Sequence, residues 1–286
     1  MNTQENSAFF DVLKRYKIQL IGLVLLLGGV YHSIFAEMVM DWYNDPDYSH
    51  GFLVPLISGY FVYQRRETLK KTLVSPYAPG LFVVILGILL LIIGYMGTEL
   101  FTMRSSLLIV LAGIILNLFG KKIFRVLLLP GFYLVFMIPL PEIVYNAIAF
   151  PLKLFVAKYS VLFLQVINIT VYREGNIIMF PNIVLEVADA CSGIRSLMSL
   201  VALSVAISFF VKASNLKKTV IVLSAVPIAV FTNSLRVIIT GILAKYWGVA
   251  AAEGFFHEVA GMLVFGLAML MLFIVGIILS EKDTQE

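Results

Sequence analysis

Eight apolar runs, each long enough or nearly long enough to cross a bilayer, constrain this 286-residue chain more than any other feature. They lie at about 18–36, 50–64, 80–97, 104–119, 123–140, 194–211, 219–244 and 257–279. With 60% hydrophobic and only 13% charged residues, the chain has too little polar surface for a soluble globule of this size. We therefore expect an all-α polytopic membrane protein: residues 1–286 would form a single integral membrane domain with about eight transmembrane helices.

Basic residues gather in short clusters between these runs. Five clusters hold 14 of the 21 Lys and Arg residues, and they alternate with acidic or neutral connections: Lys14/Arg15/Lys17, Arg65/Arg66/Lys70/Lys71, Lys121/Lys122/Arg125, Lys212/Lys217/Lys218 and Lys282. By the positive-inside rule, these clusters and both termini face the cytoplasm, which predicts a multi-pass protein of the cytoplasmic (inner) membrane. This distribution reflects topology in the lipid bilayer, and we expect no nucleic-acid partner.

An insertion at 141–193 separates the fifth and sixth runs and is predicted to be extracytoplasmic. Its first part, 143–168, is apolar but carries Pro151, Lys153 and Lys158, so we expect an interfacial or re-entrant helix rather than a ninth span. Segments 171–180 and 183–187 then alternate and are rich in β-branched residues, which predicts short β-strands.

The only cysteine, Cys191, lies where this insertion meets the next apolar run. Asp189 is a plausible N-cap, which would place Cys191 near the second position of the helix. There, unpaired N–H groups and the helix dipole favour the thiolate, and Arg195 one turn on adds a positive charge. The alternative is that a lone cysteine in a membrane protein is simply a small buried apolar residue. A single cysteine also excludes an internal disulfide and a multi-cysteine metal site.

Two further ionisable residues are costly to place in or near a bilayer. Arg236 lies inside the seventh run, roughly 12 Å from its outer end, and His257 opens the eighth. A structural pairing for Arg236 and an interfacial position for His257 are the simpler interpretations. The topology, however, places both residues and Cys191 toward the same membrane face. A thiol, an imidazole and a guanidinium together can supply the nucleophile, the acid/base and the oxyanion donor of acyl transfer.

The motifs at 190–197 and 233–236, together with His257, resemble the Cys, Arg and His motifs of the exosortase/archaeosortase family, and 47–55 looks like the N-terminal signature of that family. The resemblance covers roughly 42–265. It implies a membrane-embedded cysteine transpeptidase or protease that forms a thioester at the outer face of the membrane. The implied partners are membrane-anchored proteins with a C-terminal sorting signal, which is a short motif, a membrane helix and a basic tail as in PEP-CTERM proteins. Water, an amine or a lipid-linked acceptor would then resolve the thioester.

Six residues are assigned supporting or substrate-contacting roles: Arg195, Asn233, Ser192, Asp189, Asp47 and His50. For Asp47 and His50, capping of the second run is an equally good explanation. We expect no cofactor, and no His/Asp/Glu spacing resembles a metal site.

The alternative function is a multi-span transporter or an envelope or exopolysaccharide assembly component, in which Arg236 and His257 bind an anion or relay protons. Such transporters often have two matching halves, and the sequence shows none.

Overall fold

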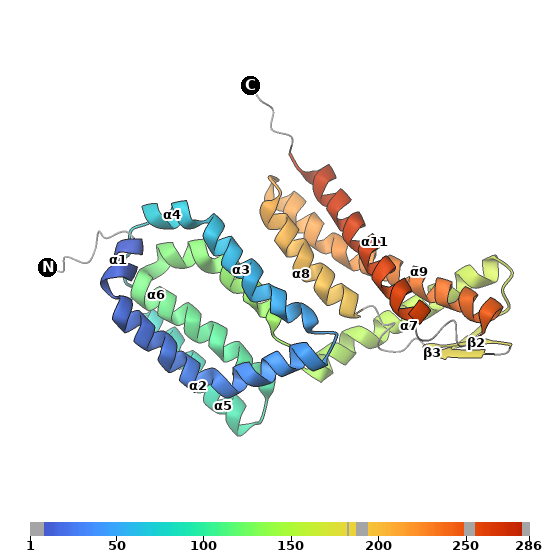
Figure 1. Ribbon diagram of the computed structural model, residues 1–286, viewed down its shortest axis with the longest axis horizontal. Coiled ribbons are helices and arrows are strands. Elements are labelled where there is room, and N and C mark those ends of the chain that lie inside the picture. Colours follow the sequence, from blue (N-terminus) through green and yellow to red (C-terminus); the bar gives the residue numbers. More distant parts are fainter. Residues whose placement is uncertain (1–8, 182, 187–193, 249–254, 282–286) are drawn as a thin grey trace. The chain divides into compact units, whose positions relative to one another are not determined.

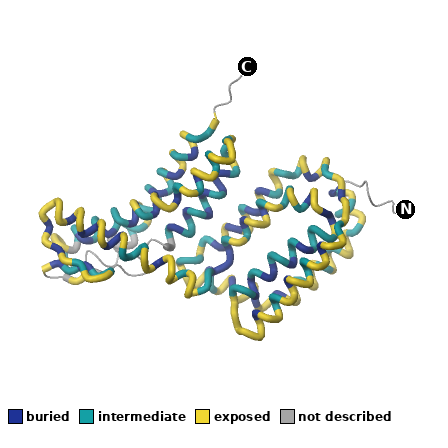
Figure 2. Tube along the Cα trace, turned by 180° about the vertical axis from the view of Figure 1, so that it is seen from behind, coloured by how far each residue is buried: buried dark blue, intermediate teal, exposed yellow. Residues whose placement is uncertain are grey.

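A computed structural model describes residues 9–181, 183–186, 194–248 and 255–281, and these residues are predominantly helical (Figure 1). The chain divides into two compact units, Met1–Pro141 and Glu142–Glu286. Large apolar side chains are exposed along the helices of both units, where they suit contact with lipid (Figure 2). The all-α polytopic membrane fold expected from the sequence fits this structure.

Over residues 9–141, the described part of the first unit, there are eight helical elements. They are α1 (Phe9–Arg15), α2 (Lys17–Asn44), the 3₁₀ turn η1 (Ser49–Phe52), α3 (Leu53–Gln64), α4 (Arg66–Lys71), α5 (Gly80–Met96), α6 (Leu100–Tyr133) and η2 (Leu134–Met137).

Helices α5 and α6 pack closely because α5 carries a glycine every seven residues on the face that meets α6. A methyl group on Gly87 would lie 2.5 Å from Cγ2 of Val110, and one on Gly94 would lie 2.8 Å from Cγ of Met103. Small residues permit this close approach between membrane helices, where packing rather than hydrophobic burial drives association. Glu99 caps α6 by accepting hydrogen bonds from the backbone of Phe101 and Thr102.

Helix α6 changes direction at Gly120, which has a φ of 85°. A side chain at this position would collide with the carbonyl oxygen of Ser75, so only glycine fits. This bend falls between the runs predicted at 104–119 and 123–140.

The second unit contains α7 (Glu142–Val166), β1 (Tyr172–Glu174), β2 (Ile177–Phe180), β3 (Ile183–Glu186), α8 (Ile194–Phe210), α9 (Asn215–Trp247) and α11 (Phe255–Leu279). The strands form an antiparallel sheet in the order β1-β2-β3, in which Tyr172 pairs with Met179 and Ile178 with Leu185. Gly175, with a φ of 61°, makes the first turn. The β segment predicted from the alternating pattern is therefore present.

The sheet is anchored to the helices by its buried side chains. Ile178 and Phe180 of β2 join a core with Leu164 of α7 and Val237 of α9. Phe180 lies so close to Gly241 of α9 that a methyl group there would be 2.9 Å from its ring.

The count of eight spans is not confirmed. Among the described residues, five helices are long and apolar enough to cross a membrane: Lys17–Asn44, Leu100–Met137, Glu142–Val166, Asn215–Trp247 and Val259–Leu279. Gly80–Met96 and Ser196–Phe210 are shorter apolar helices. The predicted run 50–64 is a 12-residue helix, α3, about 18 Å long.

The helix expected over 143–168 is present as α7, and its interfacial or re-entrant placement stays a prediction. Helix α7 runs for 25 residues without a break, through Pro151, Lys153 and Lys158, and is one of the five candidate spans. Proline removes one backbone hydrogen bond, but a membrane helix tolerates this where neighbouring groups satisfy the freed carbonyl.

Candidate active site

The helices of the second unit bring three sequence regions to one end. The backbone N–H of Glu281, just after α11, donates to the carbonyl of Lys212, just after α8, at 2.8 Å. The Glu281 carboxylate also lies 3.2 Å from Nζ of Lys217 in the first turn of α9. Helices α8, α9 and α11 alternate in direction, and α9 is the longest, so α8 and α11 begin beside the middle and second half of α9 while its last turns continue beyond them (Figure 1). Leu197 of α8 lines a cavity together with Ser234 of α9, and Gly261 of α11 lies against Arg236.

Arg236 of α9 is turned toward α11. A methyl group placed on Gly261 would lie 3.1 Å from Nη2 and 3.3 Å from Cζ of Arg236. The guanidinium therefore rests directly on the backbone of α11, in a space that exists because Gly261 has no side chain. Position 257 lies one helical turn before Gly261 on the same face of α11. The structure thus brings Arg236 to the helix face that carries His257.

The surroundings of Arg236 are polar and buried. Asn233, one turn earlier on α9, is 3% exposed, and Thr232 is 1% exposed. The Thr232 hydroxyl donates to the Ile228 carbonyl at 2.9 Å. Asn233 is therefore a buried amide one turn from Arg236 on α9, and its supporting role stays a prediction.

Several predicted site residues lie at the edge of the described chain. Cys191, Asp189 and Ser192 lie outside the described residues. The described part of α8 begins at Ile194, so Arg195 is in its first turn, and His257 is in the first turn of α11.

Asp47 and His50 belong to the first unit, where the backbone N–H of Asp47 donates to Oδ1 of Asp45 at 2.8 Å. The His50 Nε2–H donates to the carbonyl of Phe136 at 3.1 Å, and burial lowers the pKa of His50, which favours the neutral ring. The indole N–H of Trp42 donates to the Met137 carbonyl at 2.8 Å. These bonds join the end of α2 and the α2–α3 connection to η2 within this unit.

The sequence did not predict an ion pair in the first unit between a buried arginine and a half-exposed aspartate. Nη2 of Arg104 lies 2.7 Å from Oδ2 of Asp41, and the Arg104 side chain is only 3% exposed. Close by in sequence, the Ser106 hydroxyl is hydrogen-bonded to that of Tyr31 at 3.0 Å. The sequence feature that could have predicted this pair is the lone arginine at the start of the predicted run 104–119, since an ionisable residue in a membrane helix needs a partner.

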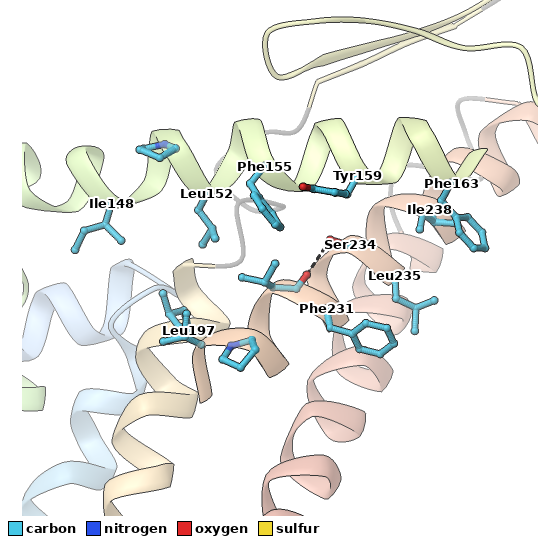
Figure 3. Close-up of a pocket in the computed structure, with 14 residues that line it drawn as sticks. Ile148, Leu152, Phe155, Tyr159, Phe163, Leu197, Phe231, Ser234, Leu235 and Ile238 are labelled. Atoms are coloured by element: carbon cyan, nitrogen blue, oxygen red, sulfur yellow. Dashed lines mark hydrogen bonds between the residues drawn. The ribbon is translucent and has the colours of Figure 1, made fainter. Parts of the chain in front are cut away.

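An apolar cavity of about 920 Å³ lies between α7 and α9. Leu152 and Phe155 border it from α7, and Phe231 and Leu235 border it from α9 (Figure 3). Leu197, at the start of α8, closes one side. We call it the α7–α9 cavity; the residues around it are Ile148, Pro151, Leu152, Phe155, Tyr159, Phe163, Leu197, Val226, Pro227, Val230, Phe231, Ser234, Leu235 and Ile238.

A comparison with protein families identifies the family of this chain. A family model described as transmembrane exosortase (EpsH type) matches residues 42–274. The chain belongs to the transmembrane exosortase family. The match to this family includes the predicted positions 191, 236 and 257, and it confirms the resemblance noted over 42–265. No curated protein and no solved structure matches the chain.

Proposed function

We propose that this exosortase is a cysteine transpeptidase or protease that cleaves the C-terminal sorting signal of exported membrane proteins. Membership in the family supports a sorting-related membrane peptidase. The observation that carries the proposal is the position of Arg236, whose guanidinium lies on α11 at Gly261, one turn from position 257. Leu197, six residues after Cys191 in the chain, lines the α7–α9 cavity together with Ser234, two residues before Arg236, and this supports the proposed partnership of Cys191 with Arg236.

In the proposed reaction, the Cys191 thiolate attacks the peptide carbonyl next to the membrane helix of the substrate, forming a C–S bond and an oxyanion. Arg236 stabilises the oxyanion with its charged N–H donors. As the tetrahedral intermediate collapses, the C–N bond breaks and His257 gives its proton to the departing amine. The resulting thioester on Cys191 is resolved by water, an amine or a lipid-linked acceptor, whose proton His257 accepts.

The proposed location follows from charge. If the basic clusters face the cytoplasm, the end of the second unit opposite to Lys212 and Lys217 faces the extracytoplasmic side. Exported proteins present their cleavage sites on that side of the cytoplasmic membrane.

The test compares the C-termini of membrane proteins in cells that carry the wild-type chain or Cys191→Ala. Proteins that end in a short motif, an apolar helix and a basic segment should keep this tail only in the variant cells. Cys191→Ser should behave like Cys191→Ala, because a hydroxyl is a far poorer nucleophile than a thiolate at neutral pH. Identical C-termini in wild-type and variant cells would overturn the proposed function.

A further inference from the structure

The α7–α9 cavity carries no charged residue in its lining, and its polar groups are few. Its two hydroxyl side chains belong to Tyr159 and Ser234. Ser234 donates its hydroxyl to the Val230 carbonyl at 2.9 Å, so it is already satisfied (Figure 3). A lining of this kind does not recognise a lipid headgroup or a soluble peptide, and it suits an apolar segment.

The cavity has the length of a substantial part of a membrane helix. Its lining residues extend from Ile148 to Phe163 along α7 and from Val226 to Ile238 along α9. At the rise of an α-helix these stretches are about 22 Å and about 18 Å long. Each stretch therefore covers more than half the thickness of the hydrocarbon core of a bilayer, which is about 30 Å.

The cavity also reaches the candidate active site. Ser234 lines it two positions before Arg236 on the same helix, and Leu197 lines it from the first turns of α8. The cavity and the guanidinium of Arg236 thus lie on different faces of one stretch of α9, toward α7 and α11 respectively. A helix lying in the cavity would end beside the residues proposed to cut next to it.

We propose that the α7–α9 cavity binds the membrane helix of the protein substrate and so positions the adjacent peptide bond for Cys191. This inference rests on the proposed function and assigns the substrate site within it. Lipid chains find equally apolar surroundings elsewhere in the bilayer, whereas a substrate helix gains packing contacts from a preformed space between two helices. Phe155 and Tyr159, whose ring centroids are 4.3 Å apart, give α7 a broad aromatic surface for such contacts.

Photocrosslinking reads this binding without requiring cleavage. Benzoylphenylalanine replaces Phe231, which lines the cavity and is 56% exposed, in a Cys191→Ala chain. The matched control replaces Phe273 of α11, which is 51% exposed and lies away from the cavity. The probe is an exported reporter with a C-terminal tail copied from a membrane protein of the same cells: a short motif, about 20 apolar residues and a basic end. We call it the tailed reporter.

The tailed reporter should crosslink to position 231 at least fivefold more than to position 273. Equal crosslinking at the two positions, or crosslinks at 231 only to lipid or within the chain, would overturn the inference. The experiment distinguishes a failure of the docking site from a failure of the proposed function. If the wild-type chain cleaves the tailed reporter but crosslinking is equal, the docking site is wrong and the function stands. If crosslinking favours 231 but the wild-type chain leaves the reporter intact, binding stands and the cleavage proposal fails.

A second pair of variants tests occupancy by size. Val226 lines the cavity and Val220 does not, although both lie on α9 and both are 45% exposed. Val226→Trp should fill part of the space and lower cleavage of the tailed reporter at least tenfold, whereas Val220→Trp should leave it unchanged. Equal cleavage by two folded variants would count against the docking site.

Discussion

Gly261→Ala tests whether the contact between α11 and Arg236 sets the geometry of the active site. A methyl group at this position would lie 3.1 Å from Nη2 of Arg236. Comfortable contacts between heavy atoms begin at about 3.5 Å, so the guanidinium must move by about 0.4 Å. A misplacement of about 1 Å in a catalytic site can cost about 100-fold in rate. If the logarithm of the rate falls in proportion to the displacement, a shift of about 0.4 Å lowers the rate roughly sixfold.

The same variant should lose activity without losing stability. Gly261 lies inside α11, and alanine in a helix interior is favoured over glycine by about 0.5–1 kcal/mol. The free energy of unfolding should therefore stay the same or rise, while cleavage of the tailed reporter slows by about fivefold to tenfold. Gly261→Leu should displace the guanidinium completely and approach the loss caused by Arg236→Ala, about 10²–10³ in rate.

The assay pairs two measurements on purified protein: the rate of tail removal in proteoliposomes and thermal unfolding in detergent. Gly266→Ala is the matched control, because Gly266 lies on the same helix and a methyl group there would meet nothing within 4 Å. It should gain similar stability without losing activity. Equal rates for Gly261→Ala and Gly266→Ala would refute the argument. A joint loss of stability and activity in Gly261→Ala would assign the contact to packing instead.

Three further outcomes are expected. Arg236→Lys should lose at least about 100-fold in cleavage while remaining folded, because an ammonium cannot reproduce the guanidinium fork; full activity would reduce Arg236 to a positive charge. A membrane-impermeant maleimide should label Cys191 in intact cells after any outer membrane is permeabilised. Labelling only after the cytoplasmic membrane is opened would place Cys191 on the cytoplasmic side. In that case α7 would cross the membrane and reverse the topology of the helices that follow it. Asp41→Asn should lower the free energy of unfolding in detergent by about 2 kcal/mol, since it leaves the buried charge of Arg104 without its ion pair. Glu67→Gln, which breaks a solvent-exposed pair, should leave the free energy of unfolding unchanged.

Local sequence determined much of the secondary structure. The apolar runs predicted at 80–97, 194–211 and 257–279 correspond to α5, α8 and α11, and the alternating segments correspond to the sheet. These features follow from composition and periodicity over a few neighbouring residues, because the backbone must satisfy its own hydrogen bonds in an apolar medium. The family motif at Arg236 was equally visible, because it is a charged residue in an apolar run.

Only the tertiary structure decided what these elements contact. The sequence showed Pro151 inside an apolar run, but only the structure shows that α7 continues through it, because the cost of a proline depends on which groups nearby can satisfy the freed carbonyl. The match between Arg236 and Gly261 joins two helices, and the α7–α9 cavity exists only where two helices leave a space between their side chains. A glycine in an apolar run does not reveal which side chain will lie over it, since that depends on helix packing between residues distant in sequence.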